Sequence, residues 1–317
     1  MGAAAGHIPH LYENLEFSFK DIFTIIQNII KGKIPSFEKI DGQNLMISVK
    51  DNIIVGARNV TQLRNPIPLP YIVDMFAKHQ HVKDAFDDGI HRILTALQDL
   101  EPTVLNSIFC NGSKFLNVEI VNRISKNVID YGDPKIVMNG LCTVADGKIL
   151  SIDPFSAIEL YQEYTPIFFK QQIYPPQLIP IKSFTDFNLM GYRKLLSKFR
   201  IVDLNIPLKN LTISKEILEK IILKIGYETI LNITSNLAYS QITKDDIQTR
   251  LLATVKNASP ENTLKIMPHL SKMQFCGGLK NTPAIEGIVF YYNNTPYKIT
   301  GIFAPINQIL GISRYSR

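Results

Sequence analysis

The amino-acid sequence predicts an α+β fold in which antiparallel sheets are interrupted by a helical module. Strand-like segments rich in β-branched residues and separated by turn residues occupy 34–59, 103–153 and 286–305. Apolar residues at helical spacing fill about 184–272 instead. A hydrophobic content of 45% in 317 residues is enough for an ordinary core.

The first predicted element is an amphipathic helix. Its apolar residues recur at spacings of three and four between Phe19 and Ile30, and Gly32 is expected to end it. We therefore assign residues 1–33 to an N-terminal helix. Over 34–59 we expect antiparallel strands joined by turns at DGQN and KDN.

The middle of the chain alternates between the two patterns. Residues 70–100 have helical spacing, and strand-like segments follow at 103–112, 113–122, 134–144 and 147–153. The Pro-rich stretch at about 174–183 is expected to be a linker, and the helical module follows it. A final hairpin is predicted with its turn at Asn293 and Asn294.

Composition narrows the class of protein. A net charge of +6 and a pI near 9 favour a polyanionic partner. Because no apolar run of membrane length and no signal peptide is visible, we expect a soluble cytoplasmic protein without a membrane partner. The three cysteines form no CxxC pair, which argues against a disulfide framework or a zinc site, and we expect all three to be buried thiols.

The sharpest local signal is the segment Lys39-Ile40-Asp41-Gly42, where a predicted strand meets a turn. A lysine at such a point is accessible for reaction, and a glycine lets the backbone come close to a ligand. The alternative interpretation is a solvated lysine followed by an ordinary Asp-Gly turn.

Further segments occur in an order that matches a known family. Glu38 to Asn44 resembles motif I of the covalent nucleotidyltransferases, the superfamily of DNA ligases, RNA ligases and mRNA capping enzymes, and is most similar to RNA ligases of the editing type. Arg58-Asn59 resembles motif Ia. Motif III is similar to residues 115–119, motif IV to residues 286–290, and motif V to residues 297–300.

The resemblance implies a set of roles. Lys39 would be the nucleophile that takes up AMP from ATP, Lys298 would contact the α-phosphate, and Glu119 would bind a ribose hydroxyl. Mg²⁺ or Mn²⁺ would be held by Glu286 and Glu119. The nucleotide-binding residues implied are Glu38, Asp41, Gly42, Arg58, Glu119, Glu286 and Lys298.

The resemblance also implies an architecture. A nucleotidyltransferase (ATP-grasp-like ligase) domain would comprise 34–175 and 280–317, with the helical module at 184–272 inserted between motifs IIIa and IV. No C-terminal OB-fold is expected. The protein would therefore be a minimal enzyme, or it would bind substrate phosphates with the basic helical module, which the resemblance does not cover. The alternative interpretation of the lysines in this module is a solvated helix face. Two departures from the family stand out: Thr300 replaces the second lysine of motif V, and 136–140 lacks the aromatic and acidic residues of motif IIIa.

The function expected from these features is ATP-dependent polynucleotide ligation. RNA is the preferred substrate, and a 5′-phosphate would be sealed to a 3′-hydroxyl through lysyl-AMP. The alternatives are a DNA nick ligase, a GTP-using capping-type enzyme, and a nucleotide, nucleic-acid or protein binding module with the fold but little turnover. The sequence leaves the oligomeric state open.

Overall fold

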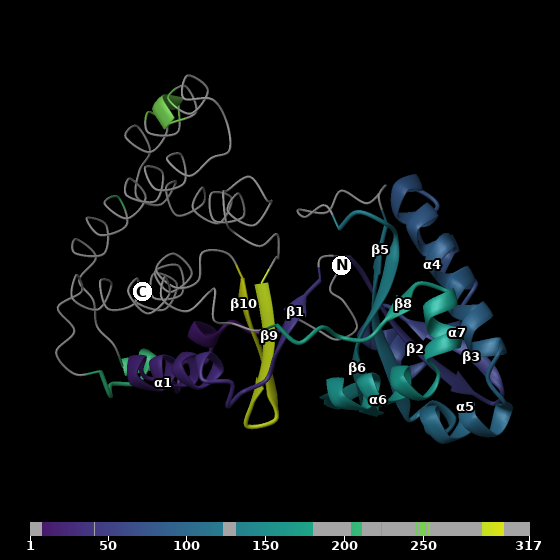
Figure 1. Ribbon diagram of the computed structural model, residues 1–317, viewed down its shortest axis with the longest axis horizontal. Helices are drawn as coiled ribbons and strands as arrows, with labels where there is room; N and C mark the ends of the chain where they lie inside the picture. Colours follow the sequence, from purple (N-terminus) through teal and green to yellow (C-terminus); the bar gives the residue numbers. More distant parts are fainter. Residues whose placement is uncertain are drawn as a thin grey trace. The chain divides into compact units, whose positions relative to one another are not determined.

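The computed structural model describes residues 8–40, 42–122, 131–179, 204–210 and 287–300, together with 223, 245, 248–250 and 253. Within these residues the protein is a mixed α+β structure with mostly antiparallel strands (Figure 1). The chain divides into two compact units, of which one comprises Met1–Ile8 and Ile40–Gln177 and the other Pro9–Lys39 and Leu178–Arg317. The predicted helical module lies almost entirely outside the described residues.

The helices and strands have the following bounds. The α-helices are α1 (Phe19–Ile30), α2 (Val60–Arg64), α3 (Tyr71–Asp74), α4 (Gln80–Gln98), α5 (Pro102–Phe109), α6 (Pro154–Glu163) and α7 (Thr165–Lys170). The strands are β1 (Ser36–Lys39), β2 (Gln43–Lys50), β3 (Ile53–Ala57), β4 (Ile67–Pro68), β5 (Lys114–Val121), β6 (Lys135–Ala145), β7 (Lys148–Asp153), β8 (Ile173–Tyr174), β9 (Gly287–Tyr292) and β10 (Thr295–Thr300). Short 3₁₀ turns lie at Leu11–Glu13, Cys110–Gly112 and Leu208–Asn210.

The unit that contains Ile40–Gln177 is built on a seven-stranded sheet. Its order is β4-β3-β2-β5-β6-β7, and β8 pairs in parallel with β6. Because side chains alternate along a strand, Leu45, Ile47 and Val49 of β2 face one side and pack with α4, α5, α6 and α7 in one apolar core. Figure 1 shows α4, α5 and α7 beside the arrows of this sheet. The opposite face holds a smaller apolar cluster that includes Met46 and Phe115.

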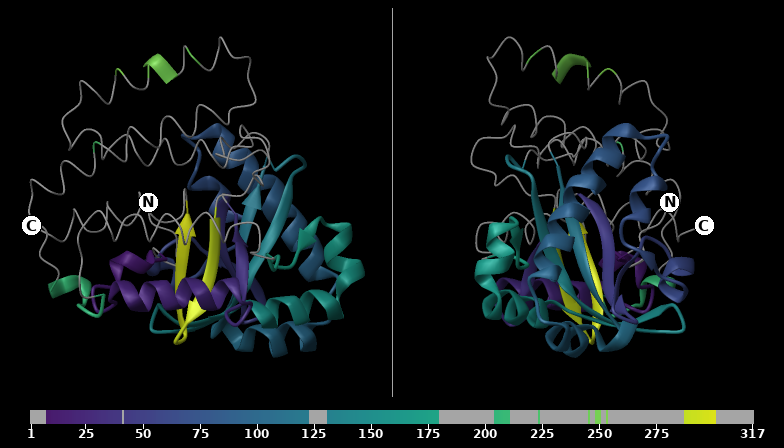
Figure 2. Two further views of the ribbon diagram at one scale, coloured as in Figure 1. Left: turned by 60° about the vertical axis from the view of Figure 1, so that its left-hand side comes forward. Right: turned by 90° about the vertical axis from the view of Figure 1, so that its right-hand side faces the viewer.

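The other unit contains a three-stranded sheet in the order β1-β9-β10. Helix α1 begins at a capping box in which the Ser18 side chain accepts from Asp21 N and the Asp21 side chain accepts from Ser18 N, and Gly32 follows the helix with φ of 69°. Phe17 precedes the helix and its ring packs on Tyr297 of β10 at 5.6 Å between centroids. Helix α1 (purple) and the β9–β10 hairpin (yellow) can be followed in Figure 2.

Two predicted hairpin turns are confirmed. Asp51 and Asn52 join β2 to β3 with φ of 51° and 61°, and Asn293 and Asn294 join β9 to β10 with φ of 50° and 60°. Asparagine and aspartate tolerate positive φ better than other non-glycine residues, so two such residues favour a tight turn.

The segment between β1 and β2 is not a hairpin turn, although DGQN was expected to join paired strands. Strand β1 pairs with β9, and β2 pairs with β3 and β5. The chain therefore passes from one sheet to the other directly after Lys39. Strand pairing over 248 residues, from Lys39 to Gly287, leaves no local signal in the sequence.

The prediction of a strand over 103–112 was wrong. Pro102–Phe109 is helix α5, with Pro102 in its first turn, where the missing N–H costs nothing. Leu105, Ile108 and Phe109 recur at helical spacing and reach the core, so a helix buries them on one side. The β-branched residues of this segment favoured the wrong element.

The expectation that every cysteine is buried was also wrong. Cys142 is buried, and this burial raises the pKa of its thiol to about 12. Cys110 is exposed, because it follows α5 in a left-handed turn with φ of 47°. Cys276 lies outside the described residues.

Candidate functional site

Polar side chains gather on the face of the seven-stranded sheet opposite the main core. Asn44 of β2 is in register with Glu119 of β5, and Asn117 lies two residues before Glu119 on the same face. Asn139 of β6 joins them through its hydrogen bonds. We call these four residues the Glu119 network. Its members belong to three neighbouring strands of one unit, so the sheet itself fixes their spacing.

Glu119 accepts hydrogen bonds at both carboxylate oxygens. The backbone N–H of Gly42 donates to Oε1 at 3.2 Å. The Asn44 amide donates to Oε2 at 3.1 Å, and the Asn139 amide is 3.5 Å from the same oxygen. Each donor comes from a different part of the sequence, so the carboxylate is oriented by tertiary structure.

Gly42 lies very close to the strand that carries Glu119. A Cβ atom at this position would be 2.6 Å from the backbone oxygen of Ile120 and 2.9 Å from Cγ of Glu119. Only glycine therefore fits without displacing β5. The close approach that requires glycine is to the protein's own strand β5, and the predicted approach of this backbone to a ligand stays a prediction.

Asn139 reaches the network through a β-bulge. Asn117 pairs with Gly140 and Val118 pairs with Met138, so Asn139 is the extra residue on β6. Its amide donates to Asn117 Oδ1 at 3.1 Å. The bulge thus adds a third amide side chain to the face that carries Glu119.

Arg58 follows β3 and supports the start of β2. Its guanidinium lies over the rings of Phe76 and Phe86, with Cζ 5.6 and 4.9 Å from their centroids, and donates a hydrogen bond to the backbone oxygen of Asn44. Burial lowers the pKa of this guanidinium, and the charge of Glu119 opposes that effect. Arg58 therefore holds the backbone beside Glu119, and its contact with a nucleotide stays a prediction.

In the other unit, Lys39 and Lys298 share one face of the three-stranded sheet. Lys39 is in register with Gly287 of β9, and Lys298 is in register with Val289 two residues further along β9. From usual strand spacings their Cα atoms are about 12 Å apart. By the same alternation Glu38 lies on the opposite face from Lys39.

Thr300 occupies the row of Lys39. Gly287 is in register with Lys39 on one side and with Thr300 on the other. The second lysine that the family carries in motif V would therefore stand at the level of Lys39, where this chain has threonine.

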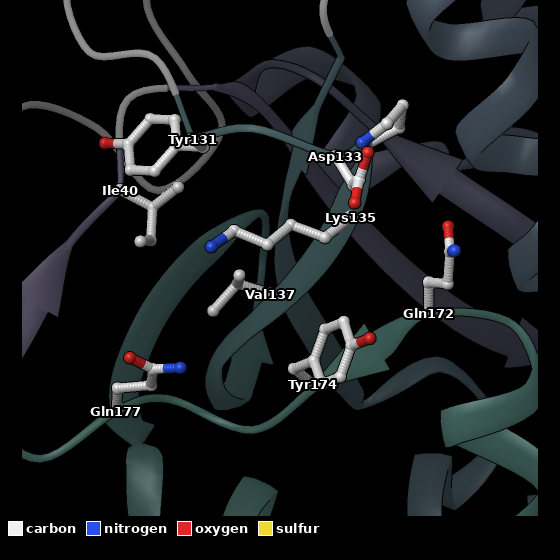
Figure 3. Close-up of a pocket in the computed structure, with 9 residues that line it drawn as sticks. Ile40, Tyr131, Asp133, Lys135, Val137, Gln172, Tyr174 and Gln177 are labelled. Carbon is white, nitrogen blue, oxygen red and sulfur yellow. The ribbon is translucent and has the colours of Figure 1, made fainter.

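A pocket of about 280 Å³ opens beside the Glu119 network. Val137, which helps to line it, is in register with Glu119 and so lies on the same sheet face. Figure 3 shows the Lys135 side chain extending between Tyr131 on one side and Val137 and Tyr174 on the other. Lys135 Nζ is 5.2 Å from the centroid of the Tyr131 ring.

Two predicted site residues, Asp41 and Glu286, lie outside the described residues, so their roles stay predictions. Within the described ranges, no group of three or more His, Cys, Asp or Glu residues could hold a metal ion. In the same part of the chain, no helix has the length and apolar character needed to cross a membrane.

The sequence reasoning missed the amides and the pocket as site features. Asn44 and Asn117 alternate with apolar residues on their strands, and this pattern could have placed them on the face of Glu119. The bulge at Asn139 and the return of Tyr174 to β6 arise from tertiary pairing, for which the sequence holds no local signal.

No protein-family model matches this chain, and no curated protein matches it at a significant level. Its function is therefore inferred from its residues and their arrangement.

Proposed function

We propose that this chain is an ATP-dependent polynucleotide ligase, with RNA ends preferred, that acts through AMP bound covalently to Lys39. The hydrogen bond from Gly42 N to Glu119 Oε1, at 3.2 Å, carries the proposal. It joins two segments 77 residues apart that resemble motifs I and III of one family. A chance match to both patterns gives no reason for the two segments to be in contact.

The position of Lys39 in the chain supports the same function. Only three peptide units separate it from Gly42, so the two Cα atoms are at most about 11 Å apart. This is the spacing of lysine and glycine in the KxDG pattern that resembles motif I. The cationic Lys298, on the same sheet face as Lys39, suits the negative charge that develops on the phosphates.

The proposed reaction has three steps. The neutral amine of Lys39 attacks the α-phosphorus, an N–P bond forms, the bond to the bridging oxygen breaks, pyrophosphate leaves and the amine proton passes to solvent. An oxygen of the 5′-phosphate then attacks the phosphorus of lysyl-AMP, a P–O bond forms, the N–P bond breaks and the lysine amine leaves. Finally the 3′-hydroxyl attacks the phosphorus of the activated 5′-phosphate, a P–O bond forms, the P–O bond to AMP breaks, AMP leaves and the hydroxyl proton passes to solvent.

Mg²⁺ or Mn²⁺ would be held by Glu286 and Glu119 and would neutralise phosphate charge. The carboxylate oxygens of Glu119 are hard oxygen donors of the kind that such ions prefer, and the amides of Asn44 and Asn139 turn their NH₂ groups towards the same carboxylate.

The pocket beside the network is proposed to take the base. Its volume of about 280 Å³ is at the small end of ligand pockets, which favours a ring system over a whole nucleotide. Ile40 and Val137 offer apolar surface, and Tyr131 and Tyr174 offer aromatic faces for stacking. These tyrosines would replace the aromatic residue that 136–140 lacks.

The test is covalent labelling of the full chain with ATP radiolabelled at the α-phosphate, in Mg²⁺ or Mn²⁺, followed by a denaturing gel. We expect a labelled band in the wild type, its loss in Lys39→Ala, and its persistence in the control Lys33→Ala, which alters an exposed lysine just before β1. No label on the wild type, or label that survives Lys39→Ala, refutes the proposal.

Two further arms separate the alternatives. Labelling by GTP in place of ATP would favour a capping-type enzyme, and joining of nicked DNA but not RNA would favour a DNA ligase. Thr300 favours a binding module with little turnover. It replaces the second lysine of motif V, and it is in register with Gly287, as Lys39 is, so the lost positive charge would have been in the same row as Lys39. Stable lysyl-AMP that is never passed to any 5′-phosphate end would support this alternative.

A further inference from the structure

Asn117 is the central residue of the Glu119 network, because it contacts both Asn44 and Asn139. The residue is buried, with 3% of its surface exposed. Its Oδ1 accepts from the Asn44 amide at 2.7 Å and from the Asn139 amide at 3.1 Å. One buried oxygen therefore binds two amide groups from two neighbouring strands.

These hydrogen bonds decide which way the neighbouring amides point. Asn117 Oδ1 and Glu119 Oε2 are both acceptors, so Asn44 and Asn139 must each turn an NH₂ group towards them. The opposite orientation would place oxygen against oxygen. The amide orientation of Asn44 is thus fixed by chemistry as well as by geometry.

This orientation leaves one acceptor without a partner. Asn44 Oδ1 is buried, and no hydrogen-bond donor reaches it in the described part of the chain. A buried acceptor without a donor is unfavourable, because it loses its hydrogen bond to water on folding and forms no hydrogen bond in its place. A bound group with an O–H or N–H would satisfy it.

We propose that Asn117 is a positioning residue for ribose recognition, which rests on the proposed function. By holding the NH₂ groups of Asn44 and Asn139 towards Glu119, it leaves Asn44 Oδ1 and the Glu119 carboxylate as two neighbouring acceptors. Two neighbouring acceptors match the adjacent 2′- and 3′-hydroxyls of a ribonucleotide. The network therefore selects a ribonucleoside triphosphate over its 2′-deoxy analogue, and Asn117 sets that selectivity without touching the ligand.

The experiment measures lysyl-AMP formation by the full chain at subsaturating ATP and 2′-deoxy-ATP. The readout is the ratio of the rate with ATP to the rate with 2′-deoxy-ATP. A general loss of stability lowers both rates by the same factor and so leaves the ratio unchanged. We expect the wild type to prefer ATP by at least about tenfold, the effect of losing one hydrogen bond to a charged group. In Asn117→Ala we expect the rate with ATP to exceed the rate with 2′-deoxy-ATP by no more than about threefold, because the hydrogen bond that distinguishes the two nucleotides is lost.

Ser48→Ala is the matched control. Ser48 is fully buried on β2, and its hydroxyl donates to the backbone oxygen of Lys114 at 2.6 Å, away from Glu119. This variant loses a buried hydrogen bond in the same sheet and is expected to keep the wild-type ratio. Asn139→Ala is the second test, since Asn139 is partly exposed on a bulge and its removal strains the fold less. It is expected to lower the ratio in the same direction.

The outcomes separate this inference from the proposed function. Absence of lysyl-AMP in the wild type refutes the proposed function itself. Lysyl-AMP that forms equally from both nucleotides in the wild type, or a ratio unchanged in folded Asn117→Ala and Asn139→Ala, overturns the role of Asn117 alone. A ratio lowered equally in Ser48→Ala also overturns it, because the effect would then be general.

Discussion

Replacement of Gly42 by alanine gives the sharpest test of the contact between Gly42 and Glu119. The added Cβ would be 2.6 Å from the backbone oxygen of Ile120, whereas ordinary contacts begin at 3.4 Å. The two strands must therefore separate by about 0.8 Å, the difference between these two distances. A backbone oxygen in a sheet cannot turn aside as the end of a flexible side chain can.

The same movement breaks a hydrogen bond. The bond from Gly42 N to Glu119 Oε1 is 3.2 Å long, and a separation of this size takes it beyond bonding distance. A hydrogen bond to a charged group contributes about 1.5 to 3 kcal/mol, which corresponds to about 10- to 150-fold. If Glu119 binds the nucleotide, the apparent KM for ATP in lysyl-AMP formation rises by about this factor.

Gly89→Ala is the control for a general steric effect. Its Cβ would meet the side chain of Ile120 at 2.7 Å, from the opposite side of the sheet to Glu119. Both variants press on the same residue, but only Gly42→Ala reaches the glutamate. We expect Gly89→Ala to change the thermal unfolding temperature and to keep the KM for ATP. A wild-type KM in folded Gly42→Ala would refute the reasoning.

Three further predictions concern the fold and the site. Ser18→Ala removes the capping box of α1 and should lower the free energy of unfolding by about 1 kcal/mol in urea titrations. Hydrogen bonds from Ser18 hold the pKa of Asp21 below its usual 3.8, so this stabilisation is present above that pH and is lost as pH falls through the lowered value. The difference between the two proteins should therefore shrink in acid, and a constant difference would contradict the assignment. Arg58→Met keeps the packing of the side-chain stem but loses the hydrogen bond to the backbone oxygen of Asn44. The free energy of unfolding in the same titration should therefore fall by about 1 to 3 kcal/mol. An unchanged free energy of unfolding would show that this hydrogen bond is unimportant. Thiol labelling at pH 8, mapped by mass spectrometry of peptides, should modify exposed Cys110 quickly and leave Cys142 unmodified until the protein unfolds, because burial raises the pKa of Cys142 to about 12; rapid labelling of Cys142 would contradict its burial.

Local features of this protein could be predicted from the sequence. The α1 helix has its apolar period and a glycine at its end, and the turn at Asn293 and Asn294 has two residues that tolerate positive φ. Such signals lie within a few residues of the structure that they determine. The exception is Pro102–Phe109, where β-branched residues suited a strand but burial of one side required a helix.

The sequence by itself determined the α+β class and the turns that follow β2 and β9. It also places Lys39 and Glu119 in segments whose resemblance to ligases stays a prediction. Only the tertiary structure decided that β1 and β2 belong to different sheets, that Gly42 is needed for the approach to Glu119, and that a bulge brings Asn139 to the same carboxylate. The physical reason is that these features depend on hydrogen bonds between strands that are distant in sequence. The residues next to a position in the chain do not determine which distant strand pairs with it.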